Sequence, residues 1–562
     1  MSEDFKKGAK MSPPAYDKEK IRQSAFELAK RQREISVAEF FEKNRHLLGF
    51  DNKRKALLTA VKEAVDNALD ACEESNILPE VNVEIIEMAE DRYRVVVEDN
   101  GPGIIKKQIP NIFAKLLYGS KFHTLKQQRG QQGIGISAAV LYSQLTTGRP
   151  ARITSKVAND STAHYYELRI NTQNNQPIIE KEESKEWNKE HGTRVELDLE
   201  GSYVKGSQSV DEYLKETAII NPHVTIIYTN PKAEQLIFPR ATNELPRMPK
   251  EILPHPYGIE IGLLIKMLGW TEARNISSFL QNEFSRVGAG TAKEILEKAA
   301  ILPNTKPKDI SLQMAERLIK AIRETKIIAP PADCISPVGA DVLERGLRKE
   351  INAEFYASVT RPPEVYRGNP FVIECVLAYG GQLDKDSPAT IMRFANRVPL
   401  LYQAGGCASV KAISSINWKA YGLQQSTGSI PVGPLLILIH LVSVWPPFTS
   451  EAKEAIAHYP EIIKEMKLAL QECGRQLGIY LRKKGRVKEQ IERVQTFESY
   501  IPEVANSLGK LSGVSAEKIK EALIRMLDKN KEFIIKNKPI ESKEAPEYGL
   551  EIKNNAGDED ID

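Results

Sequence analysis

The apolar residues between positions 55 and 74 recur at the spacing of one helix face. This stretch contains no Gly or Pro, and its apolar positions are Leu57, Leu58, Val61, Ala64, Val65, Ala68, Leu69 and Cys72. Such a period predicts an amphipathic helix. At about 100° per residue, Glu63, Asn67 and Asp70 fall within roughly 60° of one another on the opposite side. This polar side is either a solvated stripe or part of a site.

Other segments predict a chain in which helices alternate with strands. Helices are expected at residues 258–268 and 310–322, and a long helical pattern follows Thr449 as far as about Val494. The apolar run 434–442 is too short to span a bilayer and predicts a buried strand. The remaining expected strands are residues 81–86, 93–98, 192–198 and 371–377. The fold class is therefore α/β and multidomain.

Two glycine-rich turns follow the predicted helix at 55–74. Asp99 ends the strand 93–98, and Gly101 and Gly103 then let the backbone turn tightly. This turn alone also suits an ordinary hairpin. Gly130, Gly133 and Gly135 lead into the apolar, helix-compatible segment 136–142. Free N–H groups at such a helix start favour phosphate.

Together, the polar helix face and the two turns predict an ATP site that is not a P-loop. A dinucleotide-binding interpretation requires a strand before the glycines. Residues 121–129 are polar and basic instead, as in a mobile lid. No Gly-x-x-x-x-Gly-Lys-Ser/Thr motif occurs, which excludes the Walker type of ATPase.

Composition limits the class of protein further. The length of 562 residues suits about three or four domains, and 41% hydrophobic residues are enough for substantial cores. A net charge of +3 requires any DNA contact to come from local patches. Five scattered cysteines and eight histidines without ligand spacing indicate neither disulfides nor a zinc site. No signal peptide is visible, so we expect a cytoplasmic protein.

The order of these motifs, with Gly192 and Thr193 after them, is similar to the ATPase superfamily of gyrase, heat-shock chaperones, histidine kinases and mismatch-repair proteins. Residues 35–44, 64–72 and 448–457 resemble the B subunits of archaeal DNA topoisomerase VI more closely. This resemblance covers roughly residues 30 to 500. It implies a Bergerat-type α/β sandwich ATPase domain, a helix-two-turns-helix insert, and an α/β transducer domain with a long C-terminal helix.

The resemblance and two Pro-rich linkers, at 239–256 and 329–331, give the expected domain limits. A turn at 284–290 in the helical insert is either a phosphate contact or purely structural. The expected divisions are a mobile arm at 1–30, the ATPase domain at 31–250, the helix-two-turns-helix domain at 251–330, the transducer at 331–495, and a C-terminal region with an acidic tail at 496–562.

The resemblance also implies roles for individual residues. Glu63 is the expected general base, Asn67 the Mg²⁺ ligand, and Asp99 the acceptor of the adenine amino group, with Asp70 only as support. Ser120 and Lys121 are expected to close from the lid. The remaining expected nucleotide contacts are Gly101, Gly103, Gly130, Gln131, Gln132, Gly133, Ile134, Gly135, Ile136, Ser137 and Thr193.

A cation is also required near the γ-phosphate, where negative charge develops. By resemblance this is Lys453, which would reach back from the transducer domain. Lys419 is a second candidate, and Ser443 to Trp445 occupies the strand end where other superfamily members carry a Gln-Thr-Lys-type loop. We favour Lys453 because it precedes the long helix.

The function implied is the ATP-operated subunit of a type II DNA topoisomerase. Two copies would dimerise on ATP and drive a duplex through a break made by an A subunit, in an A2B2 assembly that relaxes and decatenates DNA. A mismatch-repair ATPase would lack the helical insertion. A histidine kinase needs a phosphoacceptor on a dimerising helix, and only His46 lies upstream. The basic residues at 475–493 are either a solvated face or part of a lever helix that holds the partner subunit.

Overall fold

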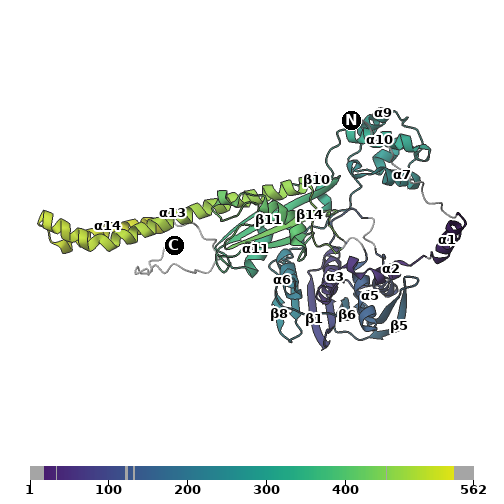
Figure 1. Cartoon of the computed structure of the whole chain (residues 1–562), viewed down its shortest axis with the longest axis horizontal. Helices are drawn as coiled ribbons and strands as arrows, with labels where there is room; N and C mark the ends of the chain where they lie inside the picture. Colours follow the sequence, from purple (N-terminus) through teal and green to yellow (C-terminus); the bar gives the residue numbers. More distant parts are fainter. Residues whose placement is uncertain (1–17, 33, 120–123, 131–132, 451, 537–562) are drawn as a thin grey trace, which may run out of the picture.

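The computed structural model describes residues 18–32, 34–119, 124–130, 133–450 and 452–536. Within these ranges the chain forms two β-sheets, a separate helical block and a long helix that projects from the second sheet (Figure 1). The α/β multidomain class predicted from the sequence is therefore confirmed. None of the helices in the described ranges combines the length and apolar character needed to cross a bilayer.

The first sheet has eight strands in the order β5-β4-β3-β6-β2-β1-β7-β8. It is mixed, because β1 pairs with β7 in parallel while the other neighbours are antiparallel. The strands are β1 (Glu80–Ala89), β2 (Arg92–Asp99), β3 (Ala151–Lys156), β4 (Ala163–Asn171), β5 (Gln176–Lys185), β6 (Gly192–Glu200), β7 (Thr225–Thr229) and β8 (Gln235–Phe238).

Helices cover one face of this sheet. Alternate strand residues such as Val83, Val95 and Val195 share one core with Leu57 and Leu141 of the helices, as expected for a strand period of two. The N-cap Ser36 accepts a hydrogen bond from the backbone N–H of Glu39 at 3.1 Å. The helices of this module are α2 (Val37–Lys43), α3 (Lys53–Glu74), α4 (Ile109–Ala114), α5 (Gly135–Thr147) and α6 (Val210–Ile220).

The second sheet has six strands and is covered on both faces. Cys375 and Leu377 on β11 pack into the core that includes α12 and α13, whereas Val376 and Ala378 pack toward α11 and the end of α6. The strand order is β10-β11-β14-β12-β13, with β9 paired to β11. The elements are α11 (Ala340–Glu350), β9 (Phe355–Thr360), β10 (Glu364–Tyr366), β11 (Asn369–Tyr379), β12 (Thr390–Ala395), β13 (Val398–Pro399), α12 (Ala408–Ser414), β14 (Leu435–Ser443) and α13 (Pro460–Ser512).

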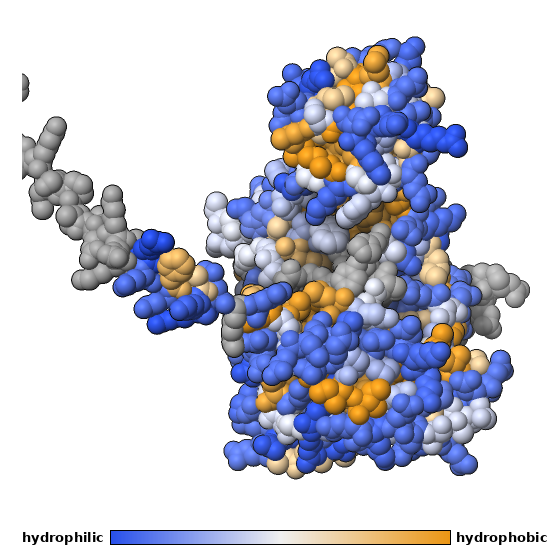
Figure 2. Space-filling model, turned by 90° about the vertical axis from the view of Figure 1, so that its right-hand side faces the viewer, coloured by the Kyte–Doolittle hydropathy of each residue, from blue (hydrophilic) through white to orange (hydrophobic). Residues whose placement is uncertain are grey.

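The helical block that lies between the two sheets in the sequence has its own core and stands apart from both sheets in Figure 1. Apolar side chains also reach its surface in Figure 2, and exposed examples on its first helix are Leu263, Ile265 and Trp270. The expected turn at 284–290 lies between two of its helices, and Arg286 there has a φ of 61°. The helices are α7 (Ile261–Trp270), α8 (Ile276–Asn282), α9 (Ala289–Ala299) and α10 (Leu312–Glu324).

The long helix differs from its sequence-based limits at both ends. α13 begins at Pro460 rather than directly after Thr449. Proline suits this first position because a backbone N–H in the first turn of a helix has no partner within the helix. The helix then continues through Pro502 and ends at Ser512, followed by the capping residue Gly513, whose φ is 73°. α14 (Ala516–Lys536) packs back against this end, and Ile501, Ala505 and Leu527 are buried.

The N-terminal region also contains more structure than expected. The described part of the predicted arm forms α1 (Lys18–Arg31), and its residues from Arg22 onward are exposed. Residues 1–17 of that arm and the acidic tail at 537–562 lie outside the described residues.

Candidate nucleotide site

The two sheet-containing modules enclose a cavity of about 680 Å³. The first module contributes the polar face of α3, the end of β2 and the start of α5. Residues 399–402 and 452–454 contribute from the second module; of these, Pro399, Leu401, Tyr402, Ala452, Lys453 and Glu454 line the cavity. Most of the candidate site residues lie in the same lining: Glu63, Asn67, Asp99, Gly103, Gly130, Gly133, Ile134, Gly135, Ile136, Thr193 and Lys453.

The carboxyl end of β2 forms one wall. Asp99 is buried, and its Oδ1 accepts hydrogen bonds from the backbone N–H groups of Gly101 at 2.8 Å and Thr193 at 3.1 Å. Burial raises the pKa of Asp99 to about 6, although these two donors oppose the shift. Gly103 has a φ of 76°, and a Cβ there would overlap the carbonyl of Lys156. This turn therefore requires a glycine.

The glycine loop and the polar face of α3 meet directly. A Cβ on Gly135, the first residue of α5, would overlap the carboxylate of Glu63. Ser137 is buried, and its hydroxyl donates to the carbonyl of Ile134 at 2.9 Å, so it caps the loop rather than lining the cavity. Asn67 is exposed at the cavity wall. The predicted contacts Ser120, Lys121, Gln131 and Gln132 lie outside the described residues.

Lys453 enters the cavity lining from the segment between β14 and α13. It is buried and has a φ of 54°, a backbone conformation that is uncommon for a side chain of this type. Its Nζ donates to the carbonyl oxygen of Arg129 at 3.0 Å, beside the first glycine of the loop. Lys419, the other candidate, is exposed on the short helix Trp418–Tyr421 that packs against α13.

A second lysine lies close to Glu63. Lys62 donates to the carbonyl of Ala452 at 3.4 Å, and burial followed by repulsion from Lys453 lowers its pKa. One turn along α3, Asp66 accepts a hydrogen bond from the hydroxyl of Tyr213 at 2.9 Å. Burial raises the pKa of Asp66 to about 6. Neither Lys62 nor Asp66 was among the sequence-based candidates, although Lys62 lines the same cavity as Glu63.

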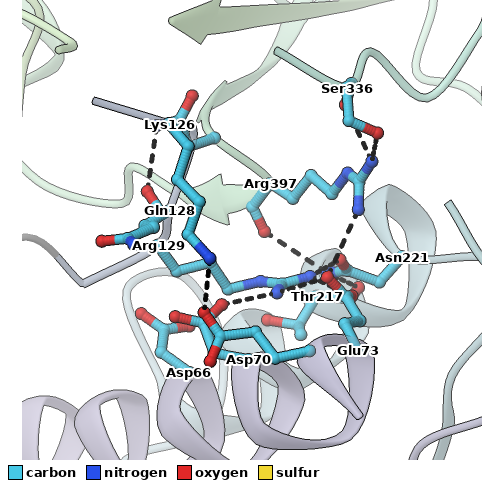
Figure 3. A network of polar contacts seen from close by, with 12 residues as sticks. Asp66, Asp70, Glu73, Lys126, Gln128, Arg129, Thr217, Asn221, Ser336 and Arg397 are labelled. Atoms are coloured by element: carbon cyan, nitrogen blue, oxygen red, sulfur yellow. Dashed lines mark hydrogen bonds and ion pairs between the residues drawn. The ribbon is translucent and has the colours of Figure 1, made fainter. Parts of the chain in front are cut away.

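Asp70 points away from the cavity and into a buried charge cluster (Figure 3). It pairs with Arg129 at 2.9 Å, and Arg129 also pairs with Glu73 at 2.6 Å. Arg397 of the second module approaches the same Glu73 at 3.4 Å. Burial alone would raise the pKa of Glu73, but these cations and His223 hold it well below its usual range. The sequence-based candidates did not include this cluster, although Glu73 follows Asp70 at helical spacing.

The segment before the glycine loop differs from the predicted lid. Gln127, Gln128 and Arg129 are 8%, 7% and 5% exposed, so the end of this polar stretch is packed in the interior. Arg129 can be buried here because it pairs with Asp70 and Glu73 of α3. Only residues 124–126 of the described part remain more accessible.

Comparisons with known proteins agree with this arrangement. Residues 52–200 match the family described as "Histidine kinase-, DNA gyrase B-, and HSP90-like ATPase", and residues 330–493 match "Topoisomerase VI B subunit, transducer". The B subunit of type 2 DNA topoisomerase 6 from Methanococcoides burtonii is 52% identical over 86% of this chain and 78% of its own. That of Archaeoglobus fulgidus is 51% identical over 81% of this chain and 76% of its own.

The chain belongs to the family of type 2 DNA topoisomerase 6 B subunits. The resemblance and the ATPase and transducer folds expected from the sequence are thereby confirmed. In this chain the matched ATPase region contains Glu63 and the glycine loop, and the matched transducer region contains Lys453.

Proposed function

We propose that the cavity binds ATP and that its hydrolysis operates a gate through which duplex DNA passes. The observation that carries this proposal is the convergence of Glu63, Asn67, Asp99, the glycine loop and Lys453 on one cavity between two modules. Lys453 lies far from the others in the sequence, so this convergence is a property of the fold. The domain divisions expected from the sequence are part of the same proposal.

Asp99 recognises the adenine in this proposal. A buried carboxylate whose Oδ1 is held by two backbone donors has a fixed orientation, and it can accept a hydrogen bond from an amino group. Gly101, Gly103 and Thr193 shape this wall. At neutral pH Asp99 is ionised, because its pKa of about 6 lies below 7.

The loop 130–137 holds the phosphates. The start of α5 presents free backbone N–H groups and the positive end of its dipole, and both favour an anion. Gly130, Gly133 and Gly135 keep the backbone open to the cavity, and Ser137 braces the loop from behind. Gln131, Gln132, Ser120 and Lys121 add donors to the phosphates in this proposal.

Glu63 activates the attacking water, and Lys453 neutralises charge on the γ-phosphate. Both line the cavity, on opposite modules. A carboxylate base contributes about 10²–10⁴-fold and a positioned cation is of similar importance. Because Lys453 belongs to the transducer, its engagement would connect the nucleotide state to the orientation of α13.

Asn67 would hold Mg²⁺. The described residues contain no group of three or more His, Cys, Asp or Glu side chains that could bind a metal unaided. A single amide oxygen fits Mg²⁺, which keeps several waters and takes the remaining ligands from phosphate oxygens. The ion, when bound with ATP, supplies charge neutralisation of the phosphates.

The partners proposed are an A subunit that makes the double-strand break, duplex DNA, and a second copy of this chain. The relatives are named as the B subunits of a topoisomerase, which supports a partner A subunit, and we propose that the two form an A2B2 assembly. Basic residues of α13 at 482–488 are largely exposed, and Lys484 pairs with Glu354. ATP-driven dimerisation would then capture a DNA segment between two copies.

The decisive test mixes this chain with its A subunit and measures relaxation of supercoiled DNA and decatenation. We expect activity with ATP, none without it, and arrest after at most one passage with a non-hydrolysable analogue. Glu63→Ala should remove multiple turnover. Relaxation by this chain alone, without ATP, would overturn the proposal.

A further inference from the structure

The three residues before the phosphate loop are each held by the transducer module. Gln127 donates its backbone N–H to the carbonyl of Cys334 at 2.8 Å, and its Oε1 accepts from the backbone N–H of Ser336 at 2.6 Å. The carbonyl of Gln128 accepts from the Nδ2 of Asn396 at 3.0 Å. The carbonyl of Arg129 accepts a hydrogen bond from Nζ of Lys453 at 3.0 Å. The backbone leading into the loop therefore takes its position from the second sheet.

Asn396 and Arg397 form a two-residue turn between β12 and β13. Both have left-handed backbone angles, with φ of 48° and 64°. Two adjacent left-handed residues are characteristic of a tight hairpin turn, in which Asn is common but Arg is not. The arginine therefore occupies a position that local backbone preference disfavours.

Asn396 is fixed firmly on its own side of the interface. Its Nδ2 also donates to the carbonyl of Ser443 at 2.8 Å, and its Oδ1 accepts from the N–H of Ser443 at 2.9 Å. Its side chain therefore makes two hydrogen bonds to Ser443 on β14 and one to Gln128, so the position of Gln128 depends on that of β14. Its exposed fraction is 2%.

The backbone of Arg397 is anchored to the transducer through a buried histidine. Its N–H donates to Nε2 of His440 at 2.9 Å, so Nδ1 of His440 carries the proton toward Glu374, 2.8 Å away. Glu374 in turn accepts from the N–H of Gly339 at 2.6 Å, immediately before α11. The turn is therefore connected to the helix layer of the second sheet.

The guanidinium of Arg397 reaches toward the ATPase module. It donates to the carbonyl oxygen of Ser336 at 2.8 Å and approaches Glu73 at 3.4 Å, beside Arg129 (Figure 3). Arg129 is held in the same place by Asp70, by Glu73 and by Asn221, whose Oδ1 is 2.5 Å away. A shift of the turn would therefore shift both the side chain and the backbone of the segment 127–129.

We propose that Asn396 and Arg397 are positioning residues that set the geometry of the phosphate loop from the transducer module. This inference rests on the proposed ATP site. Neither residue lines the nucleotide cavity, so both act through residues 127–129. Lys453 contacts the same segment at the carbonyl of Arg129 and also lines the cavity, whereas the turn contacts Gln128 and lies outside the cavity lining. Phosphate affinity then depends on how the two modules are oriented.

The test measures KM and kcat for ATP, with the melting temperature of each variant, in the full-length chain assembled with its A subunit and DNA. Arg397→Gln removes the charge that faces Glu73. Arg397→Lys keeps the charge but loses the planar guanidinium and its several N–H donors. Asn396→Gly keeps the left-handed backbone but loses the side-chain contact with Gln128. Arg361→Gln is the matched control, since Arg361 pairs with Glu465 inside the transducer at 3.2 Å.

We expect Arg397→Gln to raise KM about tenfold while kcat stays within about threefold, because loop placement contributes to binding more than to the chemical step. Asn396→Gly should raise KM by roughly 3–10-fold, Arg397→Lys should recover part of the loss, and Arg361→Gln should leave KM unchanged. Assays are run well below the lowest melting temperature.

An unchanged KM in both Arg397→Gln and Asn396→Gly, with only a lower melting temperature, would overturn the inference and leave the turn a structural contact. If Arg397→Gln does not fold, Asn396→Gly decides, because it leaves the charge cluster intact. Absence of ATP hydrolysis in the unmodified assembly would instead refute the proposed function.

Discussion

Gly135 packs its backbone against the carboxylate of Glu63, with no room for a Cβ between them. The first residue of α5 and the middle of α3 therefore fix each other at the floor of the cavity. This contact explains why the phosphate loop and the proposed base lie side by side, although Glu63 and Gly135 are 72 positions apart in the sequence. It also makes the base sensitive to a single methyl group.

Gly135→Ala is expected to displace Glu63 and lower ATP hydrolysis by about 10²-fold, because misplacement of a catalytic group by about 1 Å has effects of this size. Gly262→Ala is the control, since it adds the same methyl in open space on α7. Steady-state hydrolysis and the melting temperature of both variants check the prediction. Equal activity of the two variants would refute the role of this contact.

Lys453→Ala should nearly abolish hydrolysis, by about 10²–10³-fold, while leaving the fold intact. The lysine lines the cavity and its removal deletes a cation beside the loop. Lys419→Ala should leave hydrolysis within about twofold, because Lys419 is exposed on another surface. Retained turnover in Lys453→Ala would rule out its assignment.

ATP affinity is expected to fall as the pH drops through about 6, because burial raises the pKa of Asp99 to about 6 and protonation removes the acceptor for the adenine amino group. Asp99→Asn should bind ATP more weakly and lack this part of the pH dependence. Calorimetry of nucleotide binding to both proteins between about pH 5 and 8, a range that covers the titration of Asp99, checks this difference in pH dependence. Asp66 has a similar pKa and is retained in both proteins, so their difference isolates Asp99.

The same shift predicts a change in stability. The pKa of Asp99 is higher in the folded chain than in the unfolded chain, so the folded state binds more protons between about pH 4 and 6. The free energy of unfolding contributed by Asp99 therefore falls as the pH rises through that window. Asp99→Asn should be more stable than the unmodified chain at pH 7.5, by up to about 3 kcal/mol. Denaturant unfolding at both ends of the window measures the difference, and a less stable variant would contradict it.

The local elements of the site follow from the sequence. The apolar period predicted the helix that is observed as α3, and Asp99 lies at the end of the predicted strand. Each depends on contacts between residues close in the chain, where periodicity and glycine preferences operate. The end of α13 was predicted less well, since the expected helix stopped near Val494, whereas packing against α14 supports the observed helix through Pro502.

The charge cluster could not be predicted in the same way. Arg397 meets Glu73 across 324 positions, and Lys453 meets Arg129 across another 324. Pairings of this range are decided by how the two modules pack, which no local pattern records. The polar segment before Gly130 therefore resembled a solvated lid, while in the structure its last residues are buried by acids on α3 and by the transducer.

The role of Glu63 as the base is best measured by single-turnover hydrolysis of ATP in Glu63→Gln. The variant keeps the shape of the side chain that Gly135 packs against and removes only the base, so ATP should bind with an affinity within about threefold of the unmodified chain. The rate of hydrolysis should fall by about 10²–10⁴-fold. Hydrolysis at the unmodified rate would contradict the assignment of Glu63 as the general base.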